Sequence, residues 1–102
     1  MNSAQKVQLS GGPDKTVTWI WLEGDHLRVE YYDFSEDAQR LFGNDIAYTI
    51  TVDEMDKLFS ALNQNEATLV PWMAQYFKSY FGIKKWLEES KIGFRLEIEG
   101  WA

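Results

Sequence analysis

The spacing of apolar residues changes twice along this chain of 102 residues, and the order of the changes constrains its fold more than any other feature. The first half contains segments with the character of β-strands. Apolar residues at helical spacing follow, and the last segment alternates apolar and polar residues again. Strands, then helices, then one closing strand predict an α+β fold, with a mostly antiparallel four- to five-stranded sheet and helices packed on one face.

Four segments have the alternation or the β-branched and aromatic content of strands, and a shorter one precedes them. In chain order they are residues 6–9, 16–23, 26–34, 45–52 and 93–99. The segment 16–23 (TVTWIWLE) is apolar on both faces, which indicates either a strand covered twice or one whose second face meets a partner. Gly24-Asp25 predicts a hairpin turn between this segment and the next.

Helical spacing and capping residues predict four helices. They are residues 35–43 capped by Ser35, a helix capped by Asp53, a helix capped by Thr68 and broken by Gly82, and residues 83–90. The apolar stripe of the third helix runs through Tyr76 to Tyr80 and is expected to face the core. The whole chain, 1–102, is expected to form a single domain, with residues 1–5 as a flexible tail.

The composition excludes several chemistries. The chain has no cysteine, and its one histidine, His26, cannot form a two-histidine metal site. It contains no phosphate-binding glycine motif and no recognisable nucleophile with its base. We therefore expect no enzymatic activity, no catalytic residue, no metal and no cofactor. No apolar run is long enough to cross a membrane and no secretory signal is visible, so a cytoplasmic location is expected.

The negative charge is concentrated in one third of the chain. Residues 23–56 hold ten acidic and two basic residues, a net charge of −8. The rest of the chain has a net charge of +2, which gives the total of −6. This balance disfavours direct binding to nucleic acid, which needs clustered basic residues. It favours a basic protein partner, attracted by the local field. The alternative is an acidic surface that only keeps the protein soluble.

The residues proposed for partner binding come from this acidic segment. If Tyr31 faces the core, Tyr32 faces outward beside Arg28 and Glu30, because side chains alternate along a strand. An exposed tyrosine among carboxylates suits a protein interface, although it could also simply cover the sheet. The proposed partner-binding residues are Asp25, Glu30, Tyr32, Asp33, Glu36, Asp37 and Asp45.

Size, acidity, absence of cysteine and an aromatic-rich α+β pattern give the chain a resemblance to bacterial immunity proteins. The stretch YYDFSEDAQRLFGNDIAYTITVDEMDKL carries this likeness, with its acidic residues at predicted turns and strand edges. The resemblance concerns the general character of the chain, so no family residue is assigned to a position. It implies a protein that neutralises a cognate toxin of a contact-dependent or other polymorphic toxin system.

The mechanism implied is electrostatic steering by the carboxylates, followed by slow dissociation from aromatic anchors such as Tyr32 and Trp21. The alternative function is a small cytoplasmic adaptor or regulatory domain that binds another protein, or itself, through residues 16–23. Under either function the chain is expected to be a monomer or a homodimer. An enzyme of unrecognised type would be indicated by a deep pocket lined by two or more carboxylates.

Overall fold

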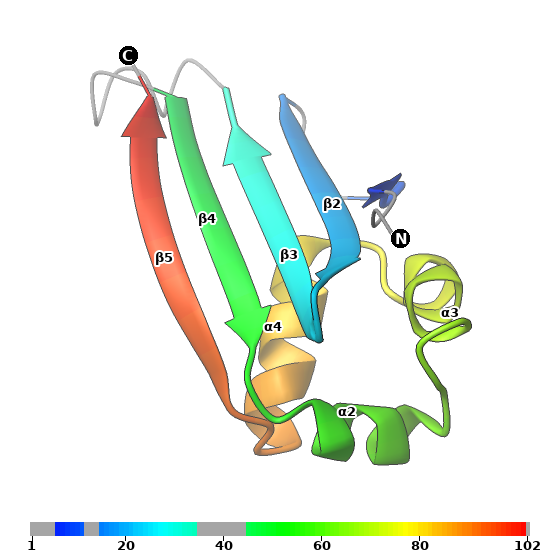
Figure 1. Ribbon diagram of the computed structural model, residues 1–102. Coiled ribbons are helices and arrows are strands. Elements are labelled where there is room, and N and C mark those ends of the chain that lie inside the picture. Colours follow the sequence, from blue (N-terminus) through cyan, green and yellow to red (C-terminus); the bar gives the residue numbers. More distant parts are fainter. Residues whose placement is uncertain (1–5, 12–14, 35–44, 102) are drawn as a thin grey trace.

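The computed structural model describes residues 6–11, 15–34 and 45–101, and it confirms the α+β fold. Within these residues, five antiparallel strands follow one another across a single sheet in the order β1-β2-β3-β4-β5 (Figure 1). The strands are β1 (Val7–Gln8), β2 (Thr16–Glu23), β3 (His26–Asp33), β4 (Asp45–Val52) and β5 (Phe94–Trp101). The expected flexible tail at residues 1–5 and the expected helix at residues 35–43 lie outside the described residues.

The hairpin between β2 and β3 forms as the sequence predicts. Glu23 pairs with His26, so Gly24 and Asp25 are the two turn residues. Gly24 adopts a φ of +60°, which glycine tolerates because it has no Cβ. The register of this turn fixes which side chains of β2 and β3 share a face of the sheet.

Three helices of the described part of the chain contact one face of the sheet. They are α2 (Met55–Leu62), α3 (Leu69–Tyr76) and α4 (Tyr80–Glu89). Helix α3 contacts β1 and β2, whereas α4 contacts β3. Leu58, Met73 and Ile83 are fully buried, one from each helix, and they pack in one cluster with side chains from the strands.

Two predicted helix boundaries are wrong. Asp53 does not cap α2: the N-cap is Glu54, which makes no side-chain capping bond, and Asp53 instead pairs with Arg95. Gly82 does not end a helix, because it lies in the first turn of α4. Its N–H is bound by the side chain of Ser79, the N-cap residue, so this glycine is stabilised at a helix start.

The core also contains stacked tyrosine rings. The ring of Tyr31 lies 5.6 Å from that of Tyr48 and 5.3 Å from that of Tyr80, measured between ring centroids. Burial raises the pKa of Tyr80 to about 12, with the nearby Tyr48 contributing further. By contrast Tyr76, which was expected to face the core, is 61% exposed, and its ring stacks on that of Trp72 at 4.7 Å between centroids.

Candidate protein-binding face

The face of the sheet away from the helices is the main candidate surface. Since Ile20, Val29 and Ile50 belong to the core, their neighbours along each strand point to the other side. Strand pairing joins these neighbours into one surface, which we call the open face. Its described side chains include Val17, Trp19 and Trp21 of β2, Arg28, Glu30 and Tyr32 of β3, and Arg95 and Glu97 of β5. Thr49 and Thr51 of β4 point to the same side but are buried.

Trp21 lies on this face but is covered by charged side chains. The Lys6 ammonium lies 4.3 Å from its ring centroid, and the Arg28 guanidinium carbon lies 5.9 Å from it. Its indole N–H donates to the carboxylate of Glu23, which also pairs with Arg28 at 3.1 Å. Trp21 is therefore only 6% exposed. It is not the accessible anchor that the sequence suggested, since these polar neighbours already occupy it.

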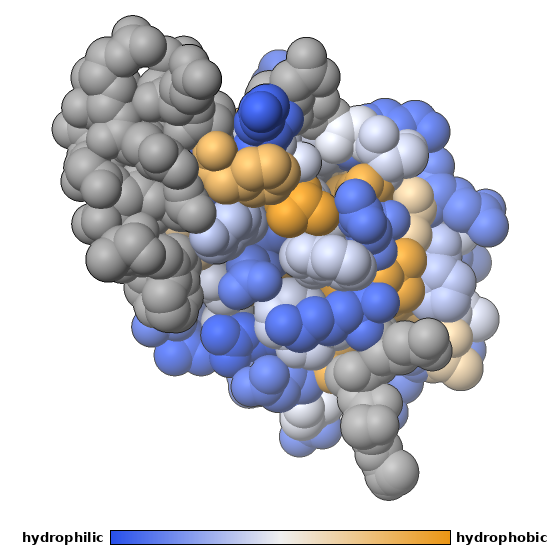
Figure 2. Space-filling model, turned by 90° about the horizontal axis from the view of Figure 1, so that it is seen from above, coloured by the Kyte–Doolittle hydropathy of each residue, from blue (hydrophilic) through white to orange (hydrophobic). Residues whose placement is uncertain are grey.

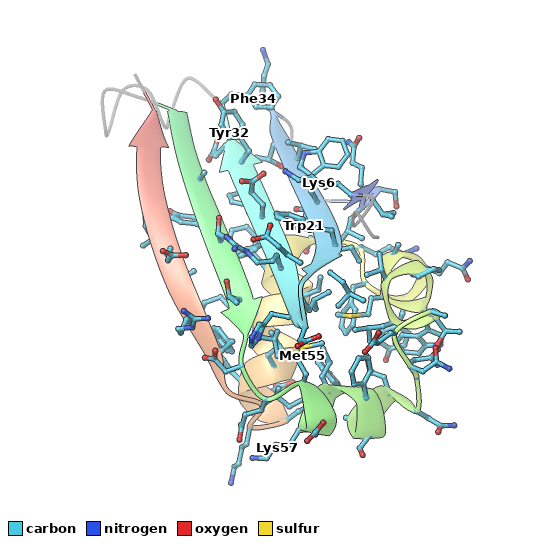
Figure 3. All side chains as sticks on the ribbon, in the orientation of Figure 1. Lys6, Trp21, Tyr32, Phe34, Met55 and Lys57 are labelled. Atoms are coloured by element: carbon cyan, nitrogen blue, oxygen red, sulfur yellow. The ribbon has the colours of Figure 1, made fainter. Side chains whose placement is uncertain are left out.

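Accessible aromatic groups remain farther along the face. Trp19 and Tyr32 are half-buried, and Phe34, just beyond β3, is 42% exposed. The rings of Tyr32 and Phe34 lie 5.9 Å apart, at the upper end of β3 (Figure 3). Seen from above, hydrophobic residues are exposed near the middle of this end of the molecule, with hydrophilic ones beside them (Figure 2). We call Trp19, Tyr32 and Phe34 the aromatic patch.

One carboxylate lies beside the aromatic patch. Glu30 is opposite Trp19 on one side and opposite Thr49 on the other, and it is half-buried. Tyr32, two residues farther along β3, is on the same face. In the middle of the sheet the open face therefore combines aromatic area with the carboxylate of Glu30, while Arg28 and Arg95 carry positive charge on the same face. Phe34 was overlooked in the sequence, although alternation from Tyr32 places it on the same side.

An acidic hollow lies at the start of β3, at the other end of this strand from Tyr32. It has a volume of about 440 Å³ and is lined by Asp25, His26, Asp53, Glu54, Met55, Asp56 and Lys57. Asp25 and Asp56 are exposed, so the hollow is open to water. Such a site can attract a cationic side chain, but it lacks the exclusion of water that assists catalysis in a deep cleft.

Several of these groups are held by specific bonds. His26 Nδ1 lies 2.8 Å from the carbonyl oxygen of Val52, so this nitrogen donates. Asp53 pairs with Arg95 Nε at 3.0 Å, and Glu54 pairs with Lys57 Nζ at 3.1 Å. The acidic hollow thus joins the β2–β3 turn, the start of α2 and, through Arg95, the start of β5.

Glu54 has a second role, which predicts a dependence of stability on pH. Its carboxylate accepts a 2.6 Å hydrogen bond from the N–H of Gly93, which, with Lys57, holds the pKa below the ordinary value of 4.5. A depressed pKa in the folded state gives stability that is present above the unfolded pKa and is lost as pH falls through the folded one. We expect Glu54→Gln to weaken this acid dependence, measured by urea unfolding from neutral pH to below pH 4.5.

The matched control for this prediction is Asp56→Asn, which removes a neighbouring carboxylate and leaves the hydrogen bond from the Gly93 N–H to Glu54 intact. It should keep the slope of stability against pH close to that of the wild type. Equal slopes in the wild type and in Glu54→Gln would contradict the role assigned to Glu54.

The residues selected from the sequence do not form a single cluster. Glu30 and Tyr32 share the open face, whereas Asp25 is in the turn seven residues before Tyr32, roughly 23 Å along an extended strand. Asp33 lies opposite Thr16 on the helix side of the sheet, where its charge adds to burial in raising the pKa of Tyr31. Asp45 begins β4 opposite Trp101, and its side chain is outside the described part. Glu36 and Asp37 lie outside the described residues.

Comparison with known proteins gives no match: neither a family model, a curated protein nor a solved structure matches this chain. Within residues 6–11, 15–34 and 45–101, no helix has the length and apolar content needed to span a membrane. In the same part of the chain, no group of three or more histidine, aspartate or glutamate side chains is placed to hold a metal ion.

Proposed function

We propose that this chain is a protein-binding domain that neutralises a basic toxin, as an immunity protein does. The observation that supports this most directly is the aromatic patch beside Glu30, on the sheet face opposite to α2, α3 and α4. An antiparallel sheet with one solvated face normally presents polar side chains there. Tyrosine and tryptophan are the residues that dominate binding energy in protein interfaces, so their presence on this face favours a partner.

Charge gives the partner its chemical character. Glu30 borders the aromatic patch, and the acidic hollow adds further carboxylates at the other end of β3, beyond Arg28. Such a field raises the rate at which a basic protein arrives, while buried aromatic contacts slow its departure. A nuclease or similar toxin with a basic cleft fits both features. The immunity role also agrees with the resemblance in size and composition described above.

The alternative of self-association through residues 16–23 has a geometric limit. Strand β2 is hydrogen-bonded to β1 on one edge and to β3 on the other. A second copy would therefore meet only the side chains on its open face, where Trp21 is already covered. This favours a different protein as the partner of the open face.

The experiment for the toxin-neutralising role pairs this chain with the toxin domain that the proposal expects to be encoded beside its gene. Production of the toxin domain alone should stop growth of the host cells, and co-production of this chain should restore it. The purified proteins should form a stable complex. Growth arrest that persists with the full chain present, together with no complex between the purified proteins, would overturn the proposal.

Variants of the open face separate steering from anchoring. We expect Glu30→Lys to reduce the association rate roughly tenfold at low salt, with a smaller reduction at high salt because ions screen the charge. Tyr32→Ala should instead raise the dissociation rate, with about a 30-fold loss of affinity if it is a central anchor. Surface plasmon resonance with the toxin domain at two salt concentrations measures both.

The matched control is Glu89→Lys, the same change of charge on the exposed end of α4. It should leave both rates within about twofold of the wild type, since a charge outside the interface has little effect on them. A Glu89→Lys effect equal to that of Glu30→Lys would mean that net charge alone, and not the open face, governs association.

A further inference from the structure

Strand β5 forms one edge of the sheet and is long enough to pair with a strand of another chain. It is eight residues long and pairs with β4 on its inner side, while no described segment pairs with its outer side (Figure 1). The other edge, β1, has only two residues. A long edge strand presents a row of N–H and C=O groups that can pair with another chain, so proteins usually protect it with inward charges, proline or a bulge.

The helix side of β5 is apolar and uncovered. Leu96 is 42% exposed and Ile98 is 63% exposed, although alternation places both on the side that carries the helices. They line a groove of about 200 Å³ with Tyr48, Tyr80, Phe81 and Lys84. Phe81 on α4 is itself 47% exposed. The groove thus runs along the same edge that presents the unpaired backbone groups.

The order of charges along β5 identifies a suitable occupant. We propose that the outer edge of β5 binds β5 of a second copy of this chain, antiparallel, with Leu96 opposite Leu96. In this register Arg95 of each copy is opposite Glu97 of the other, which makes two complementary pairs on the open-face side. Phe94 of each copy is opposite Ile98 of the other, so the apolar side chains meet on the helix side.

Two neighbouring registers also keep the open faces of both copies on the same side of the joined sheet. Each of them places two like charges opposite each other at the central residue pair. Moving the centre by one residue toward the C-terminus places Glu97 opposite Glu97, and moving it toward the N-terminus places Arg95 opposite Arg95. Like charges directly opposite each other are destabilising. Charge therefore selects the register centred on Leu96.

This pairing joins the two five-stranded sheets edge to edge. The two-fold axis of an antiparallel pair is perpendicular to the sheet, so the open faces of both copies lie on the same side. The dimer would then present two aromatic patches together and leave each of them accessible. Self-association at β5 is thus independent of whether the open face binds a toxin.

A single introduced cysteine tests the register, because the natural chain has none. At the Leu96 pair the two Cα atoms lie about 4.5–5.5 Å apart, within the range that a disulfide spans. We expect Leu96→Cys to form a covalent dimer readily under mild oxidation at about 100 μM protein, seen by non-reducing electrophoresis. Ile98→Cys is the matched control, since its two sulfurs would be attached to backbones about 13 Å apart.

Faster cross-linking of Leu96→Cys than of Ile98→Cys supports the proposal. Equal rates for the two variants, or faster cross-linking of Ile98→Cys, overturn the proposed register. Sedimentation velocity on the full natural chain supplies the second measurement. The wild-type chain should form dimers at about 100 μM. The dimer dissociation constant should rise at least tenfold in Glu97→Arg, which places a second arginine opposite Arg95, and should be unchanged in Glu89→Arg on α4. A wild-type chain that stays monomeric at this concentration overturns the proposal.

Discussion

Replacing Tyr80 with alanine is expected to lower the free energy of unfolding by about 3–5 kcal/mol, the cost of deleting a fully buried aromatic ring. Tyr80 is 1% exposed and begins α4. Its ring lies 5.3 Å from that of Tyr31, 6.0 Å from that of Tyr48 and 5.2 Å from that of Phe81. The change therefore leaves a cavity where α4 packs on β3 and β4. Urea unfolding followed by tryptophan fluorescence measures the loss.

The control is Tyr80→Phe, which keeps the ring and removes only the hydroxyl. Because burial raises the pKa of this phenol to about 12, Tyr80 is uncharged at neutral pH and the replacement removes no charge. The expected loss is about 1 kcal/mol or less, the typical net contribution of a single hydroxyl group. If the alanine variant were no less stable than the phenylalanine variant, the tyrosine stack would not hold α4 on the sheet.

The strands of this fold could be predicted from the sequence because alternation is a local property. The segments 16–23, 45–52 and 26–34 became β2, β4 and β3 with at most one residue of difference. The turn residues Gly24 and Asp25 also fixed the register of the hairpin between β2 and β3. Alternation could not show how far the helices extend over the sheet. Pairing with Ile50 places Leu96 on the helix side of the sheet, yet it remains exposed because β5 is an edge strand.

The errors at helix ends have two different causes. Ser79 is a local capping signal, and its bond to the N–H of Gly82 shows that the sequence contained the information needed to place the start of α4. Asp53, in contrast, does not cap α2, and its carboxylate accepts a hydrogen bond from Arg95, which is 42 residues later in the chain. A contact of that range depends on the pairing of β4 with β5, so spacing along the sequence could not predict it.

The candidate site shows the same division between local and distant information. The outward direction of Tyr32 follows from alternation along β3, and the structure places it on the open face with Glu30. The covering of Trp21 depends on Lys6 from the far side of a long turn, and on Arg28 from the neighbouring strand. Sequence reasoning could assign Trp21 to a face but could not determine whether other side chains already occupied it.

Trp19 and Trp21 lie on the same face, yet their replacement by alanine should lower the free energy of unfolding by different amounts. We expect Trp21→Ala to lower the free energy of unfolding by about 3 kcal/mol, because it deletes a buried ring and the cation–π contacts of Lys6 and Arg28. Trp19→Ala should cost about 1 kcal/mol, since its half-buried side chain loses less apolar contact. Urea unfolding of the two variants under the same conditions measures this difference.

Binding should show the reverse order. With a toxin partner, Trp19→Ala should weaken affinity at least tenfold as the loss of an accessible aromatic anchor, measured where both variants are fully folded. Trp21→Ala should have the smaller effect on affinity, because its ring is covered before any partner arrives. If both variants lost stability equally, the covering of Trp21 by Lys6 and Arg28 would have no energetic consequence. If Trp21→Ala weakened binding more, these cations would have to move aside on binding, and Trp21 would be an anchor after all.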